Sequence, residues 1–259
     1  SFTGRSASLF GMHQAKVNAG IGSETGVTTW NTDNYANFQV YAVKEKANNL
    51  EPESKNVRFI LTSSNPNSAT LGIIPEISSS IFKEVYNNER WNLSVRVYPT
   101  KYPNIGYVSG SESTKYTVEF AGYNLIGDTV QNSFNLTSSI TEANGINVLT
   151  ANKRVYVGSN RENFTGSLLT ATNVKASSCR YWAVPLSNEE LISHALDPKN
   201  YGTYNPMQNA FLLQDRGGYT VEVPKIKTLV MNWDFDNITG SDTGQYGGEF
   251  AVADFSSGS

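Results

Sequence analysis

The chain has 259 residues, a formal net charge of −3 and only 17% charged residues. Basic and acidic residues are interspersed, so no basic stripe is present to neutralise phosphates, and we expect no binding of nucleic acid. A single cysteine excludes an internal disulfide framework and a zinc site built on several thiolates. The longest apolar runs are too short for a helix that crosses a bilayer, so we expect no membrane insertion.

The predicted elements are mostly short strands, because β-branched and aromatic runs alternate with turn-forming Asn, Gly and Pro. The first predicted strand is at residues 57–61. Residues 77–87 fit either a strand or a helix, since the apolar spacing suits a helix and a run of serines opposes one. At residues 91–98, Trp91 and Leu93 alternate with polar residues, which is typical of a strand with one buried face. Later strands are predicted at residues 116–120, 146–149, 154–157, 179–184, 219–223 and 229–235.

Many short strands separated by turns predict an all-β sandwich or barrel and not alternating βαβ units. We expect Trp91 and either Tyr181 or Trp182 to be core aromatics of this fold. One short helix is predicted near residues 187–196. Ser187 is its N-cap and Glu190 stands three residues later, which is the sequence signature of a capping box.

Residues 174–202 contain groups that could also support catalysis, namely Cys179, Glu190 and His194, with Glu189 beside them. We expect these groups to serve the architecture instead. Glu189 and Glu190 suit the first turn of the predicted helix, and His194 suits its last turn. A lone cysteine in a strand is more often a small buried apolar residue than a nucleophile. The sequence contains no G-x-S-x-G, H-E-x-x-H or P-loop motif, so we predict no catalytic residues and no enzyme activity.

Asp234 and Asp236 form the sharpest acidic cluster, in the sequence Trp-Asp-Phe-Asp at residues 233–236. On a strand the two carboxylates share one face, where they could bind calcium together with backbone oxygens. The alternative is that both aspartates face water while the aromatic residues point into the core. Calcium at Asp234 and Asp236 is therefore a candidate metal site, and no other cofactor is expected.

Six segments follow one another along the chain, at residues 91–99, 116–124, 153–158, 163–166, 174–182 and 186–195. Their order resembles that of a laminin-G-like, concanavalin A-like domain. The resemblance covers roughly residues 35–205 and implies a two-sheet antiparallel jelly-roll sandwich. The sequence "RYW…LSNEELISHALDPKNYG" is also similar to modules of large structural proteins of tailed phages and other viruses. Glycosidases of this fold carry an E-x-D-x-E or E-x-D-x-x-E strand, which is missing here, so a glycoside hydrolase is improbable.

We therefore expect an N-terminal strand or arm at residues 1–34, the jelly-roll domain at 35–205, and C-terminal strands or the start of a further module at 206–259. The chain begins without methionine, and we expect it to be a piece of a longer polypeptide. The resemblance implies a non-enzymatic structural and adhesion module of a virion, which contacts other virion proteins or copies of itself and binds surface glycans as a possible second role. The alternative is a secreted, extracellular carbohydrate-binding lectin domain, with calcium as its candidate ion.

Overall fold

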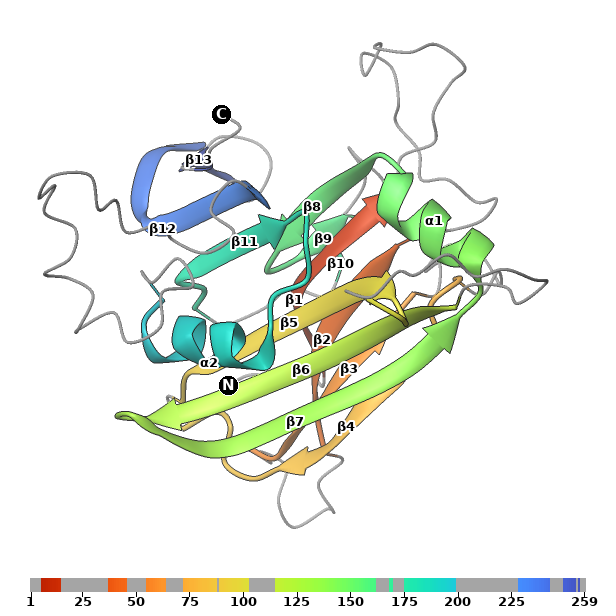
Figure 1. The fold of residues 1–259 in the computed structure, drawn as a ribbon. Coiled ribbons are helices and arrows are strands. Elements are labelled where there is room, and N and C mark those ends of the chain that lie inside the picture. The colour runs from red at the N-terminus through yellow and green to blue at the C-terminus, as the bar shows by residue number, and fades with distance from the viewer. Residues whose placement is uncertain are drawn as a thin grey trace, which may run out of the picture. The chain divides into compact units, whose positions relative to one another are not determined.

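The computed structural model describes residues 6–14, 37–45, 55–63, 72–87, 89–102, 115–161, 168–169, 175–198, 228–242, 249–254 and 256. The predicted strand at residues 219–223, the motif at residues 163–166 and most of the expected N-terminal arm lie outside these residues. In this part of the chain the polypeptide forms thirteen strands and two short helices (Figure 1), which confirms the all-β prediction. The elements are β1 Ser6–Gln14, β2 Phe38–Lys44, β3 Val57–Thr62, β4 Ile77–Phe82, β5 Trp91–Pro99, β6 Tyr116–Ile126, β7 Thr129–Ile140, α1 Glu142–Thr150, β8 Lys153–Val157, β9 Asn160–Arg161, β10 Leu168–Leu169, β11 Ser178–Trp182, α2 Asn188–Leu196, β12 Leu229–Asp242 and β13 Glu249–Asp254.

The described strands form four sheets. The largest has five strands in the order β4-β3-β2-β1-β8, and its pairs are antiparallel. Two three-stranded sheets have the orders β5-β6-β7 and β11-β12-β13, and β9 pairs with β10. Strands β6 and β7 are joined by the two-residue turn Gly127-Asp128. Gly127 has a φ of 61°, which glycine adopts without steric cost and which the first central residue of a type II′ hairpin turn requires.

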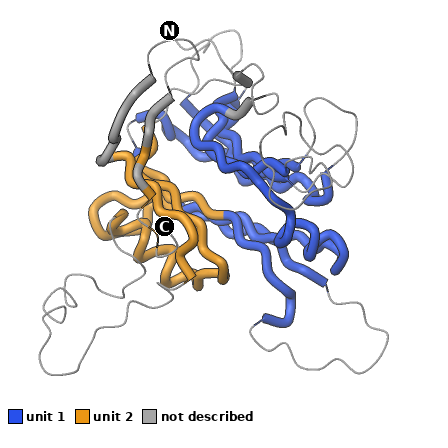
Figure 2. The backbone as a smooth tube through the Cα atoms, turned by 90° about the horizontal axis from the view of Figure 1, so that it is seen from above, with its two compact units in different colours: residues 1–89, 95–122, 132–174 blue, residues 90–94, 123–131, 175–259 orange. Residues whose placement is uncertain are grey.

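The chain divides into two compact units, which Figure 2 shows in different colours. Unit 1 comprises residues 1–89, 95–122 and 132–174, and unit 2 comprises residues 90–94, 123–131 and 175–259. Strands β5, β6 and β7 contribute residues to both units, because the division falls within each of them.

Unit 1 has a sandwich-like core in which the five-stranded sheet faces β6 and β7. Phe59 of β3 stacks on Phe134 of β7 with ring centroids 5.9 Å apart, and Phe82 of β4 approaches the same ring at 5.8 Å. Phe120 of β6 meets Phe134 edge-on at 4.9 Å. Strand β3 alternates as the pattern predicts, with Phe59 and Leu61 buried between more accessible residues. Aromatic contacts between the two layers therefore form the centre of this unit.

Unit 2 is built around the sheet β11-β12-β13 and the helix α2. Arg180 and Trp182 of β11 both contact His194 of α2, so one face of β11 lies against the helix. Arg90 fixes the C-terminal end of this helix, because its guanidinium donates to the carbonyl oxygens of Ala195 and Leu196 at 2.7 and 3.2 Å. The positive charge of Arg90 at this end of the helix is also favoured by the helix dipole.

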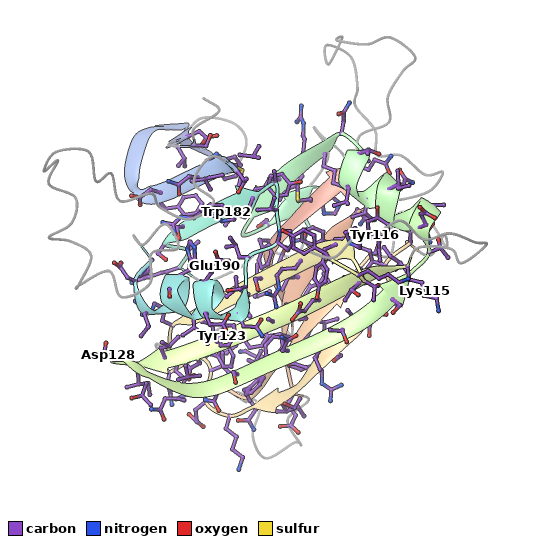
Figure 3. The ribbon with its side chains drawn as sticks, viewed as in Figure 1. Lys115, Tyr116, Tyr123, Asp128, Trp182 and Glu190 are labelled. Carbon is purple, nitrogen blue, oxygen red and sulfur yellow. The ribbon has the colours of Figure 1, made fainter. Side chains whose placement is uncertain are left out.

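One predicted strand is wrong. Residues 146–149 belong to the helix α1, whose N-cap Thr141 accepts a hydrogen bond from the backbone N–H of Asn144. Asn144-Gly145 therefore lies within the first turns of a helix and is not a β-turn. The glycine is required by packing, since a Cβ atom at Gly145 would lie 2.2 Å from the ring of Tyr116, which Figure 3 labels. Residues 77–82, left open between strand and helix, form the strand β4.

The prediction of core aromatics is also wrong. Trp91 and Trp182 are only half-buried, and Tyr181 is exposed. Tyr181 alternates with Arg180 and Trp182, so it lies on the face of β11 that points away from α2. Among the residues that the structure describes, the buried Phe and Tyr side chains are instead Phe59, Phe120, Tyr123 and Phe134.

Candidate functional site

The candidate site lies on α2 and β11, where the sequence concentrates its reactive side chains (Figure 3). The predicted capping box is present in full. Ser187 Oγ accepts from the backbone N–H of Glu190 at 3.2 Å, and the Glu190 carboxylate accepts from the backbone N–H of Ser187 at 2.5 Å. Glu190 is 4% exposed. Its carboxylate is therefore held by the start of the helix, as the sequence pattern predicts.

Arg180 connects β11, α2 and β12. Its Nη1 donates to Nδ1 of His194 at 2.8 Å, and its Nε donates to Oδ1 of Asn232 at 2.9 Å. Its Nη2 donates to the carbonyl oxygen of Pro198, just beyond the helix. Because a guanidinium group can only donate, Nδ1 of His194 is the acceptor, and the proton of the neutral ring is on Nε2.

His194 is uncharged in this setting. Its pKa is lowered to about 4, mainly by burial and also by the neighbouring Arg180 charge, while Glu190 and Asp197 oppose the shift. The imidazole also meets Trp182 edge-on, with ring centroids 5.6 Å apart. Among the described residues, the buried Nε2 atom has no hydrogen-bond partner. The basic lone pair of Nδ1 is occupied by Arg180, so this histidine cannot accept a substrate proton without breaking that contact.

Cys179 lies on β11 next to Arg180 but on the opposite face of the strand, paired with Trp233 of β12. Burial raises the pKa of its thiol to about 12. The thiolate is the nucleophilic form of cysteine, so this thiol is unreactive near neutral pH. The cysteine therefore acts as a small packing residue between the strands of unit 2.

Asp234, half of the candidate calcium site, pairs with Ser178 in the β11-β12 ladder. Asp236 belongs to β12, but its side chain lies outside the described part of the structure. Asp254 Oδ1 on β13 accepts from the backbone N–H groups of Asn232 and Ser256, each at 2.9 Å. Among the described side chains, no three His, Cys, Asp or Glu residues gather to hold a metal. The calcium site at Asp234 and Asp236 stays a prediction.

A second polar cluster, which sequence analysis did not find, lies in unit 1. Arg96 of β5 and Glu119 of β6 form an ion pair whose side chains are only 9% and 7% exposed. The hydroxyl of Tyr98 donates to the other oxygen of Glu119 at 2.9 Å. Burial raises the pKa of Tyr98, and so do the hydrogen bond and the charge of Glu119. The available signal was Glu119 itself, a charge between Val118 and Phe120 in an otherwise uncharged strand.

A third buried network joins β1 and β2 in unit 1. Nε2 of His13 lies 2.8 Å from Oε1 of Gln39, and the Gln39 amide donates to Ser8 Oγ at 2.6 Å. Gly11 makes this arrangement possible, since a Cβ atom there would lie 2.0 Å from Oε1 of Gln39. Burial lowers the pKa of His13, which keeps this ring neutral as well. The structure does not bring His13 and His194 into one described site: they belong to different units.

Comparison with protein-family models, with curated proteins and with solved structures finds no significant match to this chain. Within the described residues, neither helix has the length and apolar character needed to span a membrane.

Proposed function

We propose that this chain is a non-enzymatic structural and adhesion module of a virus particle, with the concanavalin A-like jelly-roll topology that its segment order resembles. Its partners are other virion proteins or copies of itself, and it neither binds nucleic acid nor inserts into a membrane. The sandwich-like core of unit 1 is compatible with this topology, because two β layers meet through alternating buried residues.

The observation that supports this proposal most is how unit 2 uses its reactive groups. Glu190 holds the helix start, Arg180 occupies the basic nitrogen of His194, and the pKa of the Cys179 thiol is about 12. Each group has a specific structural partner or environment, and none is poised as a base or nucleophile. The stretch that looks most catalytic in the sequence instead joins a strand to a helix.

The test is whether the chain is a constituent of assembled particles. A structural module is expected in purified particles at a fixed copy number relative to the other virion proteins.

Glycan binding is a second candidate function, and a group of side chains in unit 1 favours it. Tyr98 and Tyr102 lie with ring centroids 6.4 Å apart, and Tyr102 is 39% exposed. Beside them, the hydroxyls of Thr100 and Thr117 lie 3.0 Å apart in an exposed position. Aromatic rings that stack on sugars, next to hydroxyl groups that hydrogen-bond to them, are suited to a polar carbohydrate surface.

We expect Tyr102→Ala to weaken glycan binding about fivefold or more, since an exposed aromatic anchor contributes more than about 1 kcal/mol to such contacts. A glycan array, read with and without a calcium chelator, identifies the ligand and tests the Asp234–Asp236 prediction. Titration of the best glycan then compares the variants. Tyr181→Ala, which removes a similarly exposed tyrosine from unit 2, is the matched control and should bind like the unaltered chain. Binding to no glycan under either condition would refute this function.

A further inference from the structure

Two edge strands of unit 1 carry no charged residue. In the described sheets, the edge strands longer than two residues are β4, β5, β7, β8, β11 and β13. Four of them contain at least one charge: Arg96 in β5, Lys153 and Arg154 in β8, Arg180 in β11, and Glu249 and Asp254 in β13. By contrast, β4 reads Ile-Ser-Ser-Ser-Ile-Phe and β7 reads Thr-Val-Gln-Asn-Ser-Phe-Asn-Leu-Thr-Ser-Ser-Ile. Charges and prolines are the usual means of preventing edge-to-edge pairing, and neither strand has them.

The longer of these strands, β7, has the form of a pairing edge. Its 12 residues extend over roughly 40 Å at the usual rise per residue. Phe134 and Ile140 are buried toward the core, while the residues between them alternate outward as Asn135, Thr137 and Ser139, all exposed. Strand β7 is an edge strand of its sheet, the last in the order β5-β6-β7 (Figure 1).

The strands β4 and β7 meet at the same side of unit 1. Phe82 at the end of β4 contacts the ring of Phe134 in β7, with centroids 5.8 Å apart. Both layers of the sandwich-like unit therefore end here in an uncharged strand. On β4, Ser78 and Ser80 are exposed, and Ile81 is 39% exposed. This side of unit 1 is the surface that we call the β4–β7 edge.

We infer that the β4–β7 edge binds the same edge of a second copy of this chain, with the two β7 strands pairing antiparallel about a two-fold axis. An isologous contact places a surface against itself, so a charge near the two-fold axis meets its own like-charged copy. The outward residues of β7 are Thr, Gln, Ser and Asn, which hydrogen-bond across antiparallel strands without repulsion. The uncharged composition thus suits self-pairing in particular. This inference deepens the proposed function and rests on it, since it names one of the module's partners and the surface that binds it.

The experiment measures the mass of the purified chain by analytical ultracentrifugation over a wide concentration range. The unaltered chain should form a dimer. Asn135→Lys and Asn135→Glu each place a like-charged pair near the two-fold axis, so each variant should dissociate at least about tenfold more readily. An equimolar mixture of the two variants should restore the dimer, because opposite charges then face each other. Ala176→Lys adds the same charge at an exposed position outside the edge and should leave the dimer intact.

Circular dichroism and thermal unfolding of each variant verify that the fold is unchanged. A chain that is monomeric at every concentration would overturn the inference, although it would leave contacts with other virion proteins untouched. A dimer that survives Asn135→Lys, or one that Ala176→Lys also dissociates, would overturn it equally. If each single variant loses the dimer and their mixture regains it, the inference is supported. A structural defect in the variants would not be corrected by mixing them.

Discussion

Arg96→Met is expected to lower the free energy of unfolding by about 3–5 kcal/mol, the largest effect of any single charge change that we predict. Methionine fills the space of the apolar stem of Arg96, but the Glu119 carboxylate stays buried and keeps only the neutral Tyr98 hydroxyl of these two donors. A buried charge that loses its opposite charge retains the full cost of its desolvation. Urea denaturation, followed by circular dichroism, measures the change.

The double variant Arg96→Met with Glu119→Leu is the control for this prediction. Removing both charges also removes the uncompensated carboxylate, so the double variant should regain most of the lost stability. Tyr98→Phe removes only a neutral donor and should cost about 1–2 kcal/mol. If Arg96→Met costs less than about 1 kcal/mol, the ion pair is not buried in solution as described.

The second large effect is a loss of stability on acidification that depends on His194. In the folded chain its pKa is about 4, against an ordinary value of 6.5. As the pH falls below 6.5, the unfolded chain takes up this proton while the folded chain does not. The free energy of unfolding therefore decreases between pH 6.5 and 4 and levels off below pH 4. The contribution reaches about 3 kcal/mol, since each pKa unit corresponds to about 1.4 kcal/mol.

His194→Asn isolates this contribution, because the variant lacks the titrating imidazole while the rest of the sequence is unchanged. The asparagine oxygen can accept from Arg180 where Nδ1 does now, but it does not titrate. Urea denaturation at several pH values should give a shallower acid slope for the variant between pH 6.5 and 4. Identical slopes would show that His194 is solvated and titrates normally, and that the site is more open than the structure has it.

The local elements of this fold are readable from the sequence where short-range chemistry determines them. Ser187 and Glu190 stand three residues apart, so their capping box follows from sequence spacing alone. Most strands also follow from their alternation, as β3 shows; β5 forms as a strand too, but all of its residues are half-buried and neither of its faces is fully buried. The helix α1 was not predicted because Asn144-Gly145 is a common turn sequence. In the structure, the N-cap Thr141 and the close packing of Gly145 on Tyr116 accompany a helix instead.

The parts of the candidate site that depend on long-range contacts could not be predicted. Arg180 is two positions from Trp182 on its strand, but nothing in the sequence states that it reaches His194 and Asn232. The same holds for Arg96 and Glu119, which belong to different strands and become neighbours only through sheet pairing. Such contacts depend on register and on which face of a strand is covered, and tertiary structure fixes both.

The most direct test of the proposed function is quantitative mass spectrometry of intact virus particles from the source that carries this sequence. Particles are separated on a density gradient, and peptides of the chain are measured against isotope-labelled standards in every fraction. A virion module should follow the particle peak at a constant ratio to the other virion proteins. If the chain is instead absent from that peak and recovered as free protein, it is not a component of the particle, and the proposal is wrong.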